Sequence, residues 1–252
     1  MANHLTTGRP GTSRFDALAP RRRLAVGAAL LALGIPAAHA GDWGGSVAVS
    51  SQLVDRGVAV TPPAPIVQGA VNWMSRDGWS LGVSASYQTR SPGRVAETLT
   101  QVAKSWSLSD DWQVQAGLLD YRYPGSPKAT RNYDRTELGA SVIWRDVLTM
   151  SVSAIQMAHR GGGPRGAADV GFRWPLGWHV SATGGLGLAQ YLGPAYRYHA
   201  YARPDRYSYG HGGLVWQDGP WRVELIHVFT NRERNDGERA VSPWTATVAR
   251  TF

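Results

Sequence analysis

Cysteine is absent from this chain of 252 residues. Its absence excludes a disulfide framework, thiolate metal sites, thiol catalysis and a lipoprotein anchor. Long hydrophobic runs are also missing, because after residue 40 no apolar stretch approaches the roughly 18 residues of a membrane-spanning helix. Extended helical periodicity is missing as well, so the regular structure of the chain is expected to consist of strands.

The first forty residues have the pattern of a secretory signal peptide. A basic block, Arg21-Arg22-Arg23, precedes the apolar run Leu24 to Ala38, and Ala38-His39-Ala40 has the small-x-small form of a cleavage site. A buried helix or a short anchor is the alternative. We therefore expect residues 1–40 to be a signal peptide cleaved near Ala40, and residues 41–252 to form a single domain.

Acidic residues are few, with 18 Asp and Glu against 26 Lys and Arg and a formal net charge of +8. Removal of residues 1–40 takes away five arginines and one aspartate, so the net charge falls from +8 to +4. The remaining chain has no run of basic residues interleaved with aromatics, which argues against a nucleic-acid partner.

Residues 41–252 alternate between apolar and small or polar side chains with a period of two, which is typical of strands with two different faces. The segment "WSLGVSASYQ" places Trp79, Leu81 and Val83 on one face and serines and glycine on the other. Most of these segments are about ten residues long, the length of a tilted membrane strand. We predict twelve strands near 44–54, 66–74, 79–89, 97–108, 112–123, 135–145, 147–158, 167–174, 178–191, 206–217, 221–232 and 243–252.

The predicted connections alternate in length. Short turns fall at 75–78, 109–111, 146, 175–177 and 218–220, and long loops fall at 55–65, 90–96, 124–134, 159–166, 192–205 and 233–242. Short periplasmic turns and long external loops are the layout of a bacterial outer-membrane barrel. The predicted fold class is therefore all-β, a transmembrane antiparallel up-and-down β-barrel of about 12 strands, in which an even count brings both termini to the periplasmic end.

Tryptophan gathers at the short turns. Aromatic rings with a polar tip collect where the acyl chains meet the headgroups, so such residues predict a belt at the membrane interface. Nine of the eleven tryptophans are assigned to this belt: Trp73, Trp79, Trp106, Trp112, Trp144, Trp174, Trp178, Trp216 and Trp221. All ten tyrosines fall in or beside the long loops, and we expect them to form the opposite belt.

The second face of the strands is polar, and we expect it to line the interior of the barrel. A soluble β-sandwich or barrel is the alternative, but its inner face would be rich in bulky apolar side chains. Besides Gln52, the predicted pore-lining residues are Gln68, Asn72, Gln88, Glu97, Gln101, Gln113, Gln115, Glu137, Asp169, Arg173, His179, Arg222 and Glu224. The same groups could instead bond to one another and plug a narrow barrel.

Two further segments bear on partners and family. The last strand, "WTATVARTF", ends in Phe252, and a terminal aromatic resembles the signal recognised by the barrel assembly machinery. Arg56-Gly57 with "PIVQG" at 65–69, and "DYRYPG" at 120–125 with "YDRTELGASV" at 133–142, resemble the TorF-type (Gcw_chp-like) porins, a family of proteobacterial outer-membrane proteins. The resemblance covers about half of residues 41–252. It implies an outer-membrane barrel and no catalytic residues. Asp55 departs from the pattern, which has an aromatic residue there.

Three function classes follow from the sequence. We expect a porin-like channel for passive diffusion of small hydrophilic solutes with a mild anion preference, and no cofactor or metal. The first alternative is a plugged structural or adhesive barrel whose loop cations bind lipopolysaccharide phosphates; these are Arg90, Arg94, Lys128, Arg131, Arg160, Arg165, Arg197, Arg203, Arg232, Arg234 and Arg239. The second is a lipid-acting enzyme using Ser153 or Ser208 with His159, His199 or His211, although no nucleophile-elbow motif is present.

Overall fold

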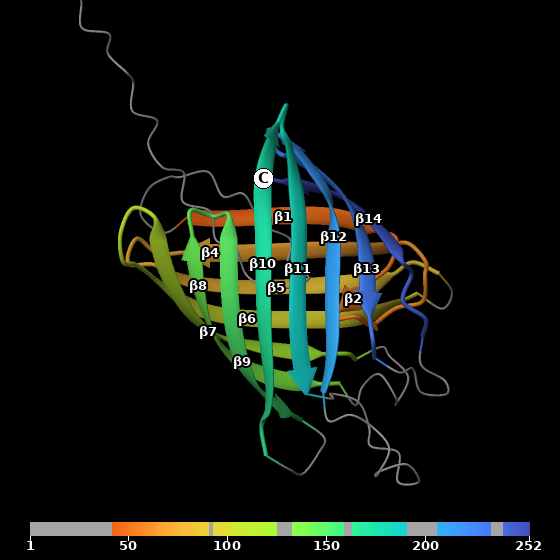
Figure 1. Cartoon of the computed structure of the whole chain (residues 1–252). Coiled ribbons are helices and arrows are strands. Elements are labelled where there is room, and N and C mark those ends of the chain that lie inside the picture. The colour runs from red at the N-terminus through yellow and green to blue at the C-terminus, as the bar shows by residue number, and fades with distance from the viewer. Residues whose placement is uncertain (1–41, 91–92, 125–132, 159–162, 191–205, 233–238) are drawn as a thin grey trace, which may run out of the picture.

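Twelve antiparallel strands close into one barrel (Figure 1). The computed structural model describes residues 42–90, 93–124, 133–158, 163–190, 206–232 and 239–252. The barrel closes where β1 pairs with both β14 and β4. Its strands are β1 (Asp42–Ser50), β4 (Ile66–Met74), β5 (Trp79–Gln88), β6 (Arg94–Ser107), β7 (Trp112–Arg122), β8 (Arg135–Trp144), β9 (Leu148–Met157), β10 (Arg165–Gly177), β11 (Val180–Gln190), β12 (Arg206–Asp218), β13 (Trp221–Thr230) and β14 (Trp244–Thr251).

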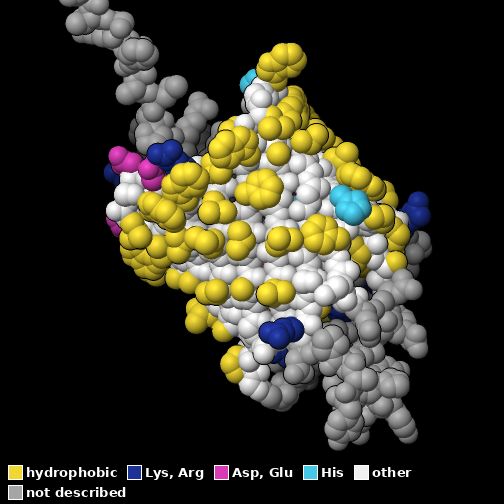
Figure 2. All heavy atoms as spheres, viewed as in Figure 1, with side chains coloured by type: hydrophobic (Ala, Val, Ile, Leu, Met, Phe, Trp, Pro, Cys, Tyr) yellow, Lys and Arg dark blue, Asp and Glu magenta, His cyan; other side chains and the backbone are white. Residues whose placement is uncertain are grey.

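These strands confirm the predicted all-β barrel and lie within a few residues of the predicted segments. Their burial alternates along the chain, because successive side chains of a strand point to opposite faces. Val83, Leu138 and Val152 on the outer wall are largely exposed, at 58%, 61% and 60%. Figure 2 shows hydrophobic side chains spread over this wall, with most charged groups toward its edges. No helix in the described part of the chain is long and apolar enough to cross a membrane.

Short turns join the strands at the end where β1 begins and β14 finishes. Phe252 and Gly45 exchange two backbone hydrogen bonds there, of 2.9 and 3.0 Å. Neighbouring turns are tied together by Arg145, whose guanidinium donates to both carboxylate oxygens of Asp111 at 2.8 and 3.0 Å. This hydrogen bond lowers the pKa of Asp111.

Tryptophans of the predicted belt flank these turns. Trp73 lies opposite Trp43, and Trp112 lies opposite Trp144, as cross-strand pairs. Basic side chains cover the rings, since Lys104 lies over Trp79 and Arg250 lies over Trp221 with the cation 5.4 and 5.5 Å from the ring centre. Amphipathic rings and long cationic side chains are typical of a headgroup boundary.

The turn between β10 and β11 differs from the prediction. Pro175 and Gly177 were expected to form the turn, but both pair with β11, and the register shifts between them. Proline cannot donate a ladder hydrogen bond and is therefore tolerated at such an irregularity. Trp178 and His179 form the turn instead, with φ of 51° and 64°, so Trp178 lies at a tip rather than on a strand.

The long connection between β1 and β4 contains a small hairpin, β2 (Val54–Asp55) and β3 (Val58–Ala59). Arg56 and Gly57 form its tip with φ of 45° and 70°. Positive φ at both central residues is the geometry of the tight hairpin turn that matches strand twist. We call residues 51–65 the luminal hairpin, because its tip contacts strands on the far side of the barrel.

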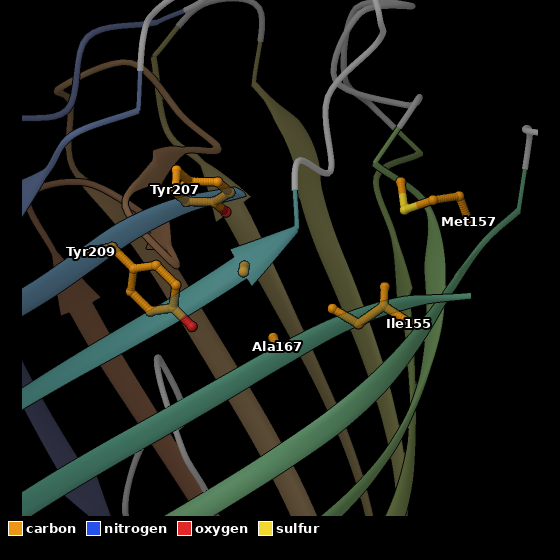
Figure 3. Packing of buried hydrophobic residues seen from close by; sticks show 6 residues of the cluster. Ile155, Met157, Ala167, Tyr207 and Tyr209 are labelled. Carbon is orange, nitrogen blue, oxygen red and sulfur yellow. The ribbon is translucent and has the colours of Figure 1, made fainter. Parts of the chain in front are cut away.

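Two apolar clusters hold the luminal hairpin inside the barrel. Val58 packs against a cluster on β9 to β12 that contains Ile155, Ala167, Tyr207 and Tyr209 (Figure 3). A second cluster joins Leu53 and Val60 of the hairpin to Ile66, Leu99, Tyr121 and Tyr123. The hairpin is therefore packed on two sides and does not rest on polar contacts alone.

The tyrosine belt predicted at the loop end is wrong for most of the described tyrosines. Tyr121, Tyr123, Tyr207 and Tyr209 are buried in the interior, at 7%, 1%, 3% and 7% exposure, and of the described tyrosines Tyr87 alone is largely exposed. Tyr121, Tyr207 and Tyr209 occupy inward positions of their strands and Tyr123 directly follows β7, and all four belong to the clusters that pack against the luminal hairpin. Tyr191, Tyr196, Tyr198 and Tyr201 lie outside the described residues.

Candidate functional site

Arg56, at the tip of the luminal hairpin, crosses the barrel to reach the opposite wall. In the ring of twelve strands, β9 lies six places from β1, the strand from which the hairpin departs. The Arg56 guanidinium donates from Nη1 and Nη2 to the two carboxylate oxygens of Glu137 on β8, both at 2.8 Å. Nη2 also donates to Ser153 Oγ at 3.3 Å, and Nε lies 3.9 Å from Asp169 on β10.

Arg135 makes the second link between the hairpin and the wall. It lies on β8 and is 1% exposed. It donates to Asp55 at 2.5 Å, to Glu137 at 2.6 Å and to the Tyr123 hydroxyl at 2.8 Å. Its guanidinium also stacks on Tyr121, with 4.0 Å from Cζ to the ring centre. The two ion pairs, the hydrogen bond to Tyr123 and the stacking on Tyr121 together stabilise this buried guanidinium. A buried cation is tolerated only when it is paired and hydrogen-bonded.

Together these residues form a charged cluster across the half of the barrel interior that lies toward the long loops. Glu97 on β6 hydrogen-bonds with Tyr123 and lies near Arg135 and Asp55. Asp169 accepts a hydrogen bond from the Tyr209 hydroxyl. The cluster of Asp55, Glu97, Glu137 and Asp169 with Arg56 and Arg135 therefore contains four carboxylates and two guanidiniums. We call these six residues the luminal ion cluster.

Toward the short turns the inner wall carries a second set of polar side chains. Arg173 on β10 donates to Gln217 on β12 at 3.1 Å, reaching across β11. Arg222 on β13 donates to Glu224 at 3.0 Å, and its side chain is 15% exposed. Gln217 and Arg222 are cross-strand partners. These four residues form a second polar group at the short-turn end of the interior.

Twelve of the thirteen predicted pore-lining residues lie on the covered face of their strands. Gln88, Gln115 and Glu137 are buried, at 6%, 5% and 2% exposure. The other nine are partly covered: Gln68, Asn72, Glu97, Gln101, Gln113, Asp169, Arg173, Arg222 and Glu224. Some bond within the wall, as Gln68 does with Ser86 at 3.3 Å. The alternation of polar residues therefore identified the inner face.

His179 is the exception. It was predicted on the inward face of a strand, but it lies in the β10–β11 turn, and its side chain is 62% exposed beside Asp218 at 3.5 Å. The prediction is wrong because Pro175 and Gly177, residues typical of turns, pair with β11, and Trp178 and His179 form the turn. Gln52, also predicted inward, lies in the luminal hairpin and is 4% exposed; it donates to Thr61 and Ala240 carbonyls at 2.8 and 2.9 Å.

The serine and histidine pairs considered for catalysis are not brought together in the described residues. Ser153 faces inward and accepts a hydrogen bond from Arg56. Ser208 and His211 are an odd number of residues apart on β12, so their side chains point to opposite faces. His159 and His199 lie outside the described residues.

Basic side chains surround the external end of the interior. Arg239 donates to the Val60 carbonyl of the luminal hairpin, and Arg232 donates to the Tyr133 hydroxyl at 2.9 Å. Arg94 donates to Gln88 at 3.4 Å. Of the other predicted loop cations, Arg90 and Arg165 are described, and Lys128, Arg131, Arg160, Arg197, Arg203 and Arg234 lie outside the described residues.

Sequence reasoning missed the three residues that link the hairpin to the wall. Asp55 and Arg56 fall in a stretch predicted to be an external loop, and Arg135 was placed on a strand without a role. Two signals were available in the sequence. Arg56-Gly57 is followed by apolar Val58 and Val60, and Arg135 alternates with Glu137 on the polar face of its strand.

Comparison with known proteins identifies the architecture. No family model matches the chain, and no curated protein matches it. The NanC porin superimposes with a TM-score of 0.52 at 13% identity, covering 84% of this chain and 99% of that one. The KdgM porin gives 0.49 at 10% identity, covering 83% and 98%. The outer membrane protein OprD from Pseudomonas aeruginosa gives 0.39 at 11% identity, covering 75% and 59%.

The likeness to the NanC porin extends over almost the whole of that protein, so this chain has the fold of a twelve-stranded porin barrel. At 13% identity the likeness carries the fold and no more. A fold alone does not determine function, which depends on the residues inside the barrel.

Proposed function

We propose that this protein is a porin-like channel of the bacterial outer membrane, through which small hydrophilic solutes diffuse passively. The observation that carries the proposal is the inverted wall of the barrel, with large apolar side chains exposed outside and amides, hydroxyls and charges inside. An apolar exterior between aromatic rims suits a bilayer, and a polar interior suits water and polar solutes. The barrel fold shared with the NanC porin supports the same function.

The luminal hairpin narrows this channel at its external half. Its tip reaches the opposite wall, and apolar packing fixes it on two sides. Solutes therefore pass a constriction at the luminal ion cluster before they reach the polar group around Arg173 and Arg222. We expect small solutes to pass and large ones to be excluded.

We propose a mild anion preference. Arginines stand at both ends of the interior, Arg94, Arg232 and Arg239 outside and Arg173 and Arg222 at the turn end. Basic side chains at a channel entrance raise the local concentration of anions. The excess of carboxylates in the luminal ion cluster opposes this effect, so the preference is expected to be small.

Swelling of liposomes that contain the purified protein tests the channel. Neutral sugars of increasing size should enter at falling rates, and the smallest should enter well above the rate for empty liposomes. The reversal potential in a salt gradient tests selectivity, and the double variant Arg173→Ala, Arg222→Ala should lose the anion preference. Arg250→Ala is the matched control, because Arg250 lies at the same end but over Trp221 on the outer wall. An equal change of reversal potential in the double variant and in Arg250→Ala would contradict the assignment of the anion preference to Arg173 and Arg222.

A plugged structural barrel is the second candidate, and the luminal hairpin is the observation that favours it. In that case the buried contacts of Arg56 and Arg135 fill the interior, and the external arginines bind lipopolysaccharide phosphates. Liposomes containing folded protein would then show no swelling with any solute.

The remaining expectations belong to the same proposal. The protein reaches the outer membrane after cleavage of residues 1–40, and Phe252 is recognised by the barrel assembly machinery. Lipids and lipopolysaccharide surround it, and it acts as a channel rather than as an enzyme. Its relationship to TorF-type porins stays a prediction.

A further inference from the structure

The wall opposite the luminal hairpin has the features of a binding site for a guanidinium group. Glu137 presents both carboxylate oxygens in one plane to Arg56, at 2.8 Å each. Ser153 supplies a hydroxyl acceptor at 3.3 Å, and Asp169 supplies a second carboxylate at 3.9 Å. Fork-to-fork pairing of this kind is specific for a planar guanidinium, and an ammonium cannot reproduce it.

The acceptors of this site are held in place by other residues of the barrel. Arg135 donates to Glu137 Oε1 at 2.6 Å, and the Tyr209 hydroxyl donates to Asp169. Glu137 is 2% exposed and Asp169 is 16% exposed, so the site is largely shielded from water. Glu137 and Asp169 are therefore each held by a contact that does not involve Arg56.

The charge of the site requires a cation. Without Arg56, the luminal ion cluster contains four carboxylates and Arg135 as its one guanidinium. Desolvated carboxylates in such excess bind a cation strongly or take up protons. Arg56 supplies that cation from the chain itself, on a tip whose positive φ is unusual for a side chain of this size.

We propose that Glu137, Asp169 and Ser153 form a guanidinium-binding site in the channel, and that Arg56 of the luminal hairpin is its tethered internal ligand. A solute that carries a guanidinium group exchanges with Arg56 at the constriction. The effect of this exchange on transport rests on the proposed channel function, whereas binding of a guanidinium group to the site does not.

The site is tested by binding of free L-arginine to the purified full-length protein in detergent, measured by titration calorimetry. The Arg56→Ala variant should bind L-arginine, and it should bind L-citrulline, the uncharged analogue of the same shape, at least about tenfold more weakly. The wild type should bind L-arginine far more weakly than the variant, because a tethered group competes at millimolar effective concentration or above.

Two variants control for unspecific attraction of cations. Adding Glu137→Gln to Arg56→Ala removes one charge and the paired acceptors, and should abolish binding. Arg222→Ala also removes an inward arginine, but Glu224 meets Arg222 through one hydrogen bond of 3.0 Å, so this variant should not bind L-arginine. If Arg56→Ala does not assemble, Arg56→Gln keeps a long uncharged side chain and takes its place.

The outcomes separate this proposal from the channel function. Binding that follows this order supports the site, whether or not the protein conducts. Folded Arg56→Ala and Arg56→Gln that do not bind L-arginine, or that bind L-citrulline equally well, would overturn the site even if the barrel conducts.

Discussion

At the residue scale, Arg135 shows what the sequence reveals and what it conceals. Alternation placed Glu137 correctly on the inner face, and the same alternation puts Arg135 beside it. The partner of Arg135 across the lumen, Asp55, is 80 residues away in sequence, and no local pattern predicts such a contact. Strand periodicity identifies the face of a residue, whereas pairing across a barrel depends on how the loops fold.

Removing Arg135 should destabilise the barrel strongly. Arg135→Ala leaves Asp55 and Glu137 without their shared cation in a buried place, and loss of one partner of a buried pair costs about 3–5 kcal/mol. Urea unfolding of the purified protein measures this change. Arg122→Ala is the matched control, since its pair with Asp120 is 44% and 35% exposed and such pairs contribute about 0–1 kcal/mol. Equal losses in the free energy of unfolding of Arg135→Ala and Arg122→Ala would contradict the expectation that burial makes the Arg135 contacts more stabilising.

At the element scale, the strands were predictable and the luminal hairpin was not. The twelve strands follow from a period of two and from regular turn spacing, and β4 coincides with its predicted range 66–74. The hairpin has strands of two residues each, Val54–Asp55 and Val58–Ala59, too short for any periodicity to appear. It is fixed by contacts with distant strands, as where Val58 packs against the Ile155 cluster.

Gly57 tests whether the hairpin tip needs its tight geometry. A Cβ at this position would lie 2.8 Å from Thr230 Cβ, on a backbone with φ of +70°. Gly57→Val should therefore strain the turn by about 1–3 kcal/mol and move the tip away from the wall, which would increase single-channel conductance. Gly69→Ala is the control, because no atom lies within 4 Å of the added Cβ. Unchanged conductance in Gly57→Val would show that the tip does not limit the channel.

At the scale of the whole molecule, the sequence predicted the barrel because every strand repeats one rule. Large apolar residues face out along the strands, polar residues face in except where Ile66, Leu99 and Ile155 pack in the clusters that hold the luminal hairpin, and all described tryptophans but Trp244 lie at the short-turn end. The luminal constriction depends on a single loop and on six residues from three strands of the barrel wall and the hairpin, so no repeated pattern along the strands predicts it. The repeated strand pattern therefore specifies the barrel, whereas contacts between residues far apart in the sequence specify its constriction.

The proposed channel and its constriction are tested most directly by the single-channel conductance of the wild type and of Arg56→Ala in planar bilayers with a salt gradient. We predict small discrete openings with a mild anion preference for the wild type. Arg56→Ala should open in larger steps and shift toward cations, because the luminal ion cluster then has one guanidinium fewer against four carboxylates. Folded protein that gives no openings in either form would contradict the proposed channel function.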